Sequence, residues 1–284
     1  MNKKIILSRM LHSYFFMIGL VCLIIVLVSV YIVPSFLPFS ATSTSLVERF
    51  TPPEGFSKGL QGHVFGTDEL GRDLLTRLLI GGQYSFRVSF ISVLIVTVIG
   101  TVFGLLAGYF GGWLDAVIMR LCEAIMAIPA LIMAIAIIAV LGQSTGNLIL
   151  VLCLSGWVQI CKLTSNNVKI VKQQEFVSAS RALGAKGMFI MFRQIFPNIT
   201  TQIIVLTSQR VGTTILMEAS LSYLGLGIPK PAPSWGDMIS SGYQYLATQP
   251  WMIIVPGIAL MLSVLSFNFM GDGIRDVLDT KRKV

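Results

Sequence analysis

Arg210 and Glu218 are the first candidate functional residues of this chain, because both are charged and lie inside one long apolar run. A charge within a membrane-spanning helix is costly unless it faces protein or water, so it typically marks a pathway or a buried pair. At 100° per residue the two side chains are predicted to lie about 80° apart, on one broad helix face. We interpret both as residues of a substrate path, with Arg210 suited to a carboxylate. The structural alternative is that each charge is satisfied by another helix or another subunit.

The other titratable groups do not converge on a catalytic or metal site. His12 and His63 are predicted to lie on opposite sides of a membrane, with His63 at the surface. Glu123 is expected to pair with Arg120, three residues before it. Four cysteines lie in or next to apolar runs without forming a CxxC pair: Cys22, Cys122, Cys153 and Cys161. This favours buried thiols over a zinc site or disulfides, and we expect no catalytic residue, metal or bound cofactor.

A basic stretch at residues 162–193 interrupts the apolar sequence. Residues 175–184 are predicted to contain a short helix that Gly184 ends. Phe176 and Leu183 offer apolar anchors seven residues apart. Small residues between them would leave room for the groove of a partner protein: Ser178, Ala179 and Ser180. The segment is therefore either a docking helix or a solvated basic linker.

Composition identifies the elements that must position these residues. The chain has 284 residues, of which 54% are hydrophobic and 12% charged, and its mean hydropathy is +0.80. Soluble domains carry about 25% charged residues, whereas a membrane-spanning helix needs about 20 apolar ones. We therefore expect an all-α polytopic membrane protein with six spans, at residues 14–36, 88–110, 117–141, 147–161, 201–224 and 251–270.

The distribution of Lys and Arg predicts the orientation of these spans. Of the 21 Lys and Arg residues, fourteen fall on the side that also holds both termini, six fall on the other side, and Arg210 lies within a span. This bias predicts cytoplasmic termini and a cytoplasmic basic stretch. It also accounts for the net charge of +8 without nucleic acid.

Glycine and proline predict how the spans pack. Glycines at every fourth position of the second span would let another helix approach closely: Gly100, Gly104, Gly108 and Gly112. Pro129 and Pro256 are expected to kink the third and sixth spans, either as hinges or as ordinary bundle packing. On the outer side, residues 73–85 are predicted to form a short interfacial helix, residues 40–45 to be flexible, and Trp235 and Trp251 to mark a membrane edge.

At the basic stretch the sequence resembles a known family. The segment Glu175-Phe-Val-Ser-Ala-Ser-Arg-Ala-Leu-Gly184, with Ile195-Phe-Pro-Asn198 after it, is similar to the EAA motif of ABC importer permeases. Gly184 and Pro197 keep the spacing of that motif. Ser178, Ala179 and Ser180 replace its Glu-Ala-Ala triplet, and Phe196 replaces its usual leucine.

Further segments resemble the oligopeptide, dipeptide and nickel branch of these permeases. They are Phe65-Gly-Thr-Asp-Glu-Leu-Gly-Arg-Asp-Leu74, Leu221-Ser-Tyr-Leu-Gly-Leu-Gly-Ile228, Pro233-Ser-Trp-Gly236 and Gly271-Asp-Gly-Ile-Arg-Asp-Val-Leu-Asp279. The resemblance implies a type I importer permease fold in a bacterial cytoplasmic membrane. It implies a second related permease, two ABC ATPase subunits and an extracytoplasmic binding protein as partners, within membrane lipid. The chain has no GxxxxGK[ST] loop of its own to hold ATP.

The resemblance also implies a role for the basic stretch as the segment coupled to the ATPases. The residues expected to couple are Glu175, Phe176, Ala179, Arg181, Ala182, Gly184 and Pro197. The expected organisation is a tail and first span (1–37), an extracytoplasmic loop (38–87) and a core (88–284) whose coupling loop is 162–200. Two alternatives remain, a membrane-embedded enzyme and a carrier that needs no motor. The cargo, whether peptide, nickel chelate or another metallophore, is left open.

Overall fold

Long helices make up most of the chain in a computed structural model that describes residues 13–57 and 59–278. The bases Lys3, Lys4, Arg9, Lys58, Lys281, Arg282 and Lys283, and also His12, lie outside the described residues. The long and medium helices are α2 (Tyr14–Tyr31), α3 (Leu74–Phe110), α4 (Gly112–Met126), α5 (Ala130–Leu141), α6 (Thr145–Lys172), α9 (Phe196–Tyr223) and α11 (Trp251–Leu278). The short ones are η1 (Val33–Phe36), η2 (Leu46–Glu48), η3 (Gly59–Gln61), α7 (Glu175–Ala182), α8 (Gly187–Phe189), the π-helix η4 (Ile190–Ile195) and α10 (Trp235–Tyr243).

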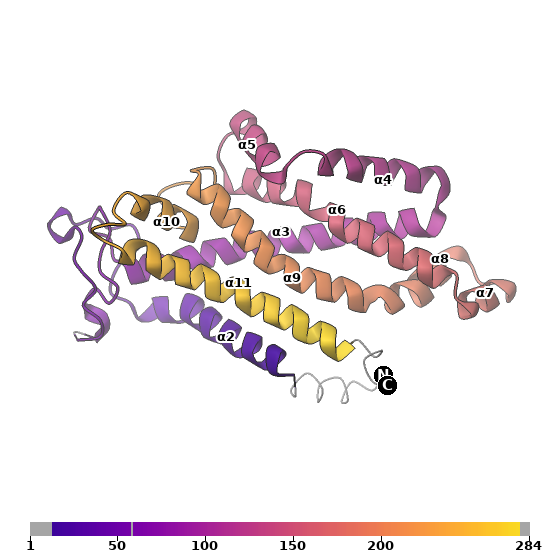
Figure 1. The fold of residues 1–284 in the computed structure, drawn as a ribbon, viewed down its shortest axis with the longest axis horizontal. Coiled ribbons are helices and arrows are strands. Elements are labelled where there is room, and N and C mark those ends of the chain that lie inside the picture. The colour runs from indigo at the N-terminus through magenta and orange to yellow at the C-terminus, as the bar shows by residue number, and fades with distance from the viewer. Residues whose placement is uncertain (1–12, 58, 279–284) are drawn as a thin grey trace.

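The all-α prediction is confirmed. Within the described residues five helices are long and apolar enough to cross a membrane, and α4 with α5 makes a sixth if the bent pair counts as one span. Figure 1 shows α3, α6, α9 and α11 running along one axis, with α2 beside α11. The loops that precede α3 gather at one end of this axis and α7 lies at the other.

The second span is longer than predicted. α3 has 37 residues, so it is roughly 55 Å long at 1.5 Å per residue, against about 30 Å for the hydrocarbon core of a bilayer. A separate interfacial helix at residues 73–85 is therefore wrong, because this segment is the first part of α3. The expected boundary between loop and core at residue 87 lies inside the same helix.

The third and fourth spans also differ from the prediction. The kink expected at Pro129 is present, but it is a bend of 85° that splits residues 117–141 into α4 and α5. The fourth span was predicted to end at residue 161, whereas α6 continues to Lys172. Its last turns carry Lys162, Lys169 and Lys172, which sequence analysis had assigned to a loop. Pro256, by contrast, lies inside an unbroken α11.

A glycine-lined contact brings the backbones of α3 and α6 close together. A Cβ atom built on Gly100 would lie 2.7 Å from the carbonyl oxygen of Trp157, one on Gly104 2.6 Å from that of Cys161, and one on Gly108 2.6 Å from that of Ser165. Such distances leave no room for a side chain, so the two backbones touch, as predicted. Gly112 is not part of this seam. It begins α4 at φ +56°, and a Cβ there would meet nothing within 4 Å.

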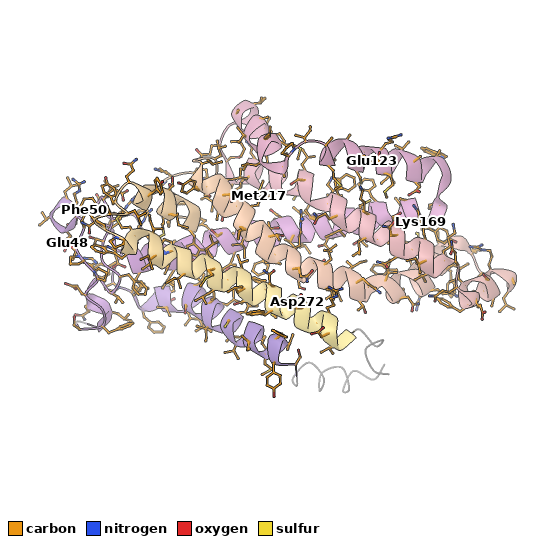
Figure 2. All side chains as sticks on the ribbon, in the orientation of Figure 1. Glu48, Phe50, Glu123, Lys169, Met217 and Asp272 are labelled. Atoms are coloured by element: carbon orange, nitrogen blue, oxygen red, sulfur yellow. The ribbon has the colours of Figure 1, made fainter. Side chains whose placement is uncertain are left out.

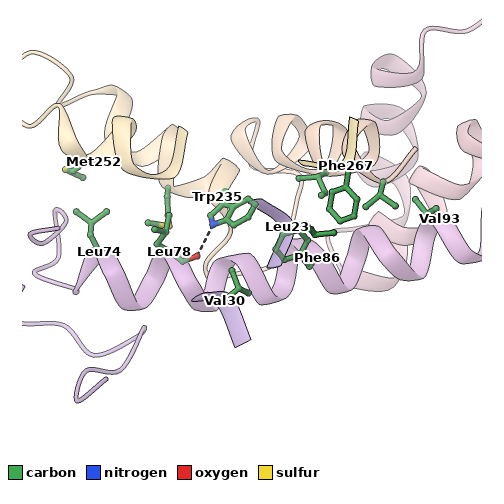
Figure 3. Packing of buried hydrophobic residues seen from close by; sticks show 12 residues of the cluster. Leu23, Val30, Leu74, Leu78, Phe86, Val93, Trp235, Met252 and Phe267 are labelled. Carbon is green, nitrogen blue, oxygen red and sulfur yellow. Dashed lines mark hydrogen bonds between the residues drawn. The ribbon is translucent and has the colours of Figure 1, made fainter. Parts of the chain in front are cut away.

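A buried cluster joins α3 to α10, α11 and α2 at the loop end (Figure 3). Trp235 is fully buried, and its indole N–H donates to the carbonyl oxygen of Leu78 at 2.8 Å. Its ring meets that of Phe86 edge to face, with centroids 5.4 Å apart. Trp235 was predicted to mark a membrane edge, and that prediction is wrong. The residue is the core contact that fixes α10 against α3.

The close contact of α3 and α6 predicts that adding even one methyl group at a glycine between them lowers the stability of the protein. In Gly104→Ala the added Cβ would lie 2.5 Å from Cβ of Thr164, and overpacking of this kind typically costs about 1–3 kcal/mol. We expect a lower midpoint of thermal unfolding for the variant in detergent. Gly257→Ala is the matched control, since a Cβ on this mid-helix glycine of α11 meets nothing within 4 Å. Equal stability of the two variants would contradict the close approach of α3 and α6.

Candidate functional site

The predicted short helix in the basic stretch is present as α7, and Gly184 ends it as expected. Gly184 adopts φ +83°, a left-handed conformation that favours glycine. The N–H of Ala185 bonds to the carbonyl of Ser180 at 3.1 Å, and the N–H of Gly184 to that of Arg181 at 3.0 Å. These two bonds form a Schellman motif, which stops the helix after two turns. Glu175 in the first turn and Arg181 in the last complement the helix dipole.

One buried side chain fastens α7 to the body of the protein. Val177 is fully buried in a cluster with Val168 and Val171 of α6, Ile195 of η4 and Ile199 of α9. The amide of Gln194 adds a hydrogen bond to the hydroxyl of Ser180. Ser180 therefore faces the body of the chain, and only Ser178 and Ala179 of the small triplet are exposed.

The remaining surface of α7 faces outward. At 100° per residue, Glu175, Ala179 and Ala182 lie within about 40° of the direction opposite Val177, and all three are exposed. Phe176 and Leu183 lie along one edge of this face, at its two ends, with 42% and 89% of their surface exposed. Arg181 and Gly184 are also exposed but lie nearer the anchored side. A small, largely uncharged face between two apolar anchors suits contact with another protein.

Aromatic residues enlarge this surface beyond α7. Met188, Phe189 and Phe192, in α8 and η4, are each more than half exposed. The π-helix η4 leads directly into α9, where the exposed Pro197 occupies the first turn. Proline has no backbone N–H, so it is tolerated at such a position. We call the exposed residues of α7, α8 and η4 the tip surface.

Polar contacts tie the base of the tip surface to the corner between α3 and α4. Lys169 Nζ lies 2.7 Å from a carboxylate oxygen of Asp115, which also accepts a hydrogen bond from Ser165. Lys172 donates to the carbonyl of Tyr109 and lies over its ring. Figure 2 shows Lys169 towards the α7 end and Glu48 and Phe50 at the opposite end. Packed and polar contacts therefore connect α7 and the end of α6 to the start of α9 and the end of α3.

Arg210 lies at the middle of α9, about 20 Å from either end at 1.5 Å per residue. Its Nη1 donates to Oε1 of Gln159 on α6 at 2.7 Å. No ion pair with a described carboxylate is present, and the side chain is only half-buried. A central arginine costs about 2.5–3.5 kcal/mol on insertion scales, so this charge has to face polar groups or water rather than lipid.

Glu218 has a different environment. It is fully buried, with Oε1 accepting from the Ser222 hydroxyl at 2.7 Å and Oε2 left without a partner among the described residues. Its surroundings are packed side chains of the chain itself, so it does not face an open path in this conformation. Only Arg210 of the two predicted path residues lies at a surface.

The motif at residues 65–74 builds a rigid cap at the opposite end from α7. Asp68 accepts from Nε of Arg72 at 2.7 Å and lies 3.3 Å from Nε of Arg77. Arg77 in turn bonds to the carbonyl of Ala41 at 3.1 Å and lies 3.7 Å from Asp237 of α10. Residues 40–45, predicted to be flexible, are tied to α3 through this bond.

His63 belongs to the same cap, and its prediction as a surface residue is wrong. It is 8% exposed, bonds through Nδ1 to Asp73 at 3.0 Å and stacks on Phe39. Asp73 also caps α3 by accepting from the N–H of Thr76 at 2.8 Å. The pair between Arg120 and Glu123 is confirmed at 2.9 Å. All four cysteines are unpaired, and Cys122 and Cys161 are buried.

Several site residues escaped sequence analysis. Val177 carried a weak signal, since it is the one apolar residue opposite the small face of α7. Gln159, Gln194 and Asp115 carried none, because their partners lie on distant segments of the chain. The described residues contain no group of three or more His, Cys, Asp or Glu side chains able to hold a metal ion.

Comparisons with known proteins agree with this architecture. The family described as the binding-protein-dependent transport system inner membrane component matches residues 100–284. The chain is 39% identical over 264 residues to the dipeptide transport system permease protein DppC of Alkalihalophilus pseudofirmus, covering 92% of this chain and 85% of that protein. It is 41% identical over 221 residues to the glutathione transport system permease protein GsiD of Escherichia coli O6:K15:H31, covering 78% and 73%.

A solved structure supports the same fold. A chain of the MetNI methionine ABC transporter, in an inward-facing conformation, superposes with a TM-score of 0.57 at 20% identity, covering 70% of this chain and 95% of that one. This likeness concerns the fold alone. The family match and the identity to DppC over most of the chain show the relationship directly. The chain therefore belongs to the inner-membrane components of binding-protein-dependent transport systems, the multi-pass permease subunits of ABC importers, in which separate subunits hydrolyse ATP.

Proposed function

We propose that the chain is one half of the translocation pathway of an importer for short peptides, and that the tip surface couples it to the ATPases. The observation that carries the coupling proposal is the geometry of α7. Val177 holds the helix to α6 and α9, while Glu175, Ala179 and Ala182 face away from the body. Such a helix has a free outer face and a fixed inner one, as a force-transmitting contact requires.

The cargo proposal rests on the relatives. One is named for dipeptide transport and another for glutathione transport. A nickel chelate or another metallophore is the competing cargo within the expected branch. Uptake by the reconstituted complex distinguishes them, because a peptide importer accumulates a radioactive dipeptide but not a radioactive nickel chelate. A second, related permease, two ATPase subunits and a binding protein that meets the cap complete the proposed complex.

Two other classes of function are less well supported. A membrane-embedded enzyme needs titratable groups that converge on a substrate, whereas Glu123 pairs with Arg120 and Glu218 is buried. A carrier without a motor would leave the tip surface without a role. Co-purification separates these alternatives, since an ATPase accompanies the chain only if it is an importer subunit.

The proposed orientation places the tip surface and both termini in the cytoplasm. In Leu183→Cys the new thiol replaces a side chain that is 89% exposed at the end of α7. We expect an impermeant maleimide to label it in inverted membrane vesicles and not in intact cells. The unsubstituted chain, with its four native cysteines, is the control for background labelling. Labelling of intact cells would overturn the orientation and the coupling role of α7 together.

The coupling role predicts that Ala179→Glu uncouples the complex. The added carboxylate would stand on the face opposite Val177, where a partner groove would have to bury an unpaired charge. We expect ATPase stimulation by loaded binding protein to fall at least tenfold, with normal insertion into the membrane. Gly184→Trp should also uncouple, but its φ of +83° means that the backbone of α7 changes as well.

Gln173→Glu is the matched control for Ala179→Glu. It adds the same charge at an exposed position at the end of α6, two residues before α7 begins. It should retain stimulation within about twofold. Unchanged stimulation in Ala179→Glu, or equal losses in both variants, would refute the assignment of the outer face of α7.

A further inference from the structure

One face of α9 is left uncovered by the rest of the chain, and it carries the central charge. α9 packs against α6, α11, α3 and α10, and in Figure 1 it runs between α6 and α11. Along its open side, residues recur at spacings of three and four, and none of them is buried: Arg210, Thr213, Met217, Ser220 and Leu224. Figure 2 shows Met217 on this helix, towards α5.

A cavity opens at the cap end of this face. Its volume is about 400 Å³, and it lies between α9, α10 and α11. Leu216, Tyr223 and Leu224 of α9 line it with Ile239 of α10 and Leu260 of α11. Pockets that hold small ligands usually measure about 300–1,000 Å³. The cavity is mainly apolar and suits a peptide side chain rather than a charged terminus.

A group that can bind the charged terminus of a peptide lies farther along α9. Arg210 has five N–H donors, of which one is used by Gln159. Gly156 lies beneath the guanidinium, where a Cβ would come within 3.2 Å of Nη2. The absence of a side chain at residue 156 therefore lets the guanidinium of Arg210 approach the backbone of α6 closely. The planar fork of an arginine fits a carboxylate through two parallel hydrogen bonds.

We propose that Arg210, oriented by Gln159, binds the C-terminal carboxylate of a peptide as it passes along α9. The inference rests on the proposed function and adds the chemistry that the permease itself recognises. Arg210 has no described acidic partner, so a carboxylate brought by the cargo supplies the missing charge. Gln159 is a positioning residue, since it fixes one arm of the guanidinium and leaves the other donors open.

The cavity and Arg210 lie at successive positions along α9. Ten residues separate Arg210 from Ser220, which is about 15 Å along a helix. An extended dipeptide spans only about 7 Å. Leu216, the lining residue nearest to Arg210 along the chain, is six residues or about 9 Å away. Cargo that moves along α9 from the cavity toward the middle of the helix therefore passes from an apolar contact to a charged one.

The test compares a dipeptide with its amide in the complete importer. Proteoliposomes receive binding protein saturated with either dialanine or dialanine amide, and maximal uptake is measured. For Arg210→Gln we expect uptake of dialanine to fall about tenfold, the usual effect of losing one charge-assisted contact. Uptake of the amide should fall less than about twofold. Gln159→Glu should reproduce this selective loss, because its own carboxylate would occupy Arg210.

Arg120→Gln is the control, since it removes one positive charge from an exposed pair on α4 and should leave both rates unchanged. Equal losses for dialanine and its amide in Arg210→Gln would overturn the inference, and would assign the charge to an acidic residue of the second permease. Equal uptake of the two cargoes by the unsubstituted complex would also overturn it, while leaving the proposed function intact. Failure of that complex to import either dipeptide would overturn the proposed cargo and this inference together.

Discussion

The direct backbone contact between α3 and α6 is the constraint on which the other elements depend. Lipid offers no hydrophobic drive for two helices to associate, so close van der Waals contact has to provide it. Gly100, Gly104 and Gly108 make that contact available over two turns of helix. α3 carries the cap at one end and the turn into α4 at the other. Only two residues separate α6 from α7, so the seam helps to position both the cap and α7.

The two ends of the bundle use charge in opposite ways. At the cap, Arg72 and Arg77 are held by Asp68, Glu69 and Asp237, so the loops behave as one body with α3 and α10. At the other end the basic residues Arg181, Lys186 and Arg193 are exposed beside large apolar side chains. The first arrangement is internally satisfied. The second leaves surface that a partner can cover.

Sequence reasoning recovered what depends on local pattern and missed what depends on distant contacts. The helical class, the end of α7 at Gly184, the glycine seam and the break at Pro129 follow from periodicity and backbone preference. The helix bounds were placed too narrowly, at residue 88 for the start of α3 and at Cys161 for the end of α6, because both helices extend beyond the apolar runs that predicted them. His63 and Trp235 were misplaced, because their burial depends on Asp73 and Leu78, which belong to other segments.

The extra length of α6 has a mechanical consequence. Its 28 residues extend roughly 42 Å, against about 30 Å of hydrocarbon. Lys169 and Lys172 are in the last turn of α6, which favours placing the surplus of about 12 Å at this end, between the lipid tails and α7. A soluble protein that binds Ala179 and its neighbours would then contact α7 at the projecting end of α6. It would not need to displace lipid headgroups in order to apply force to α7.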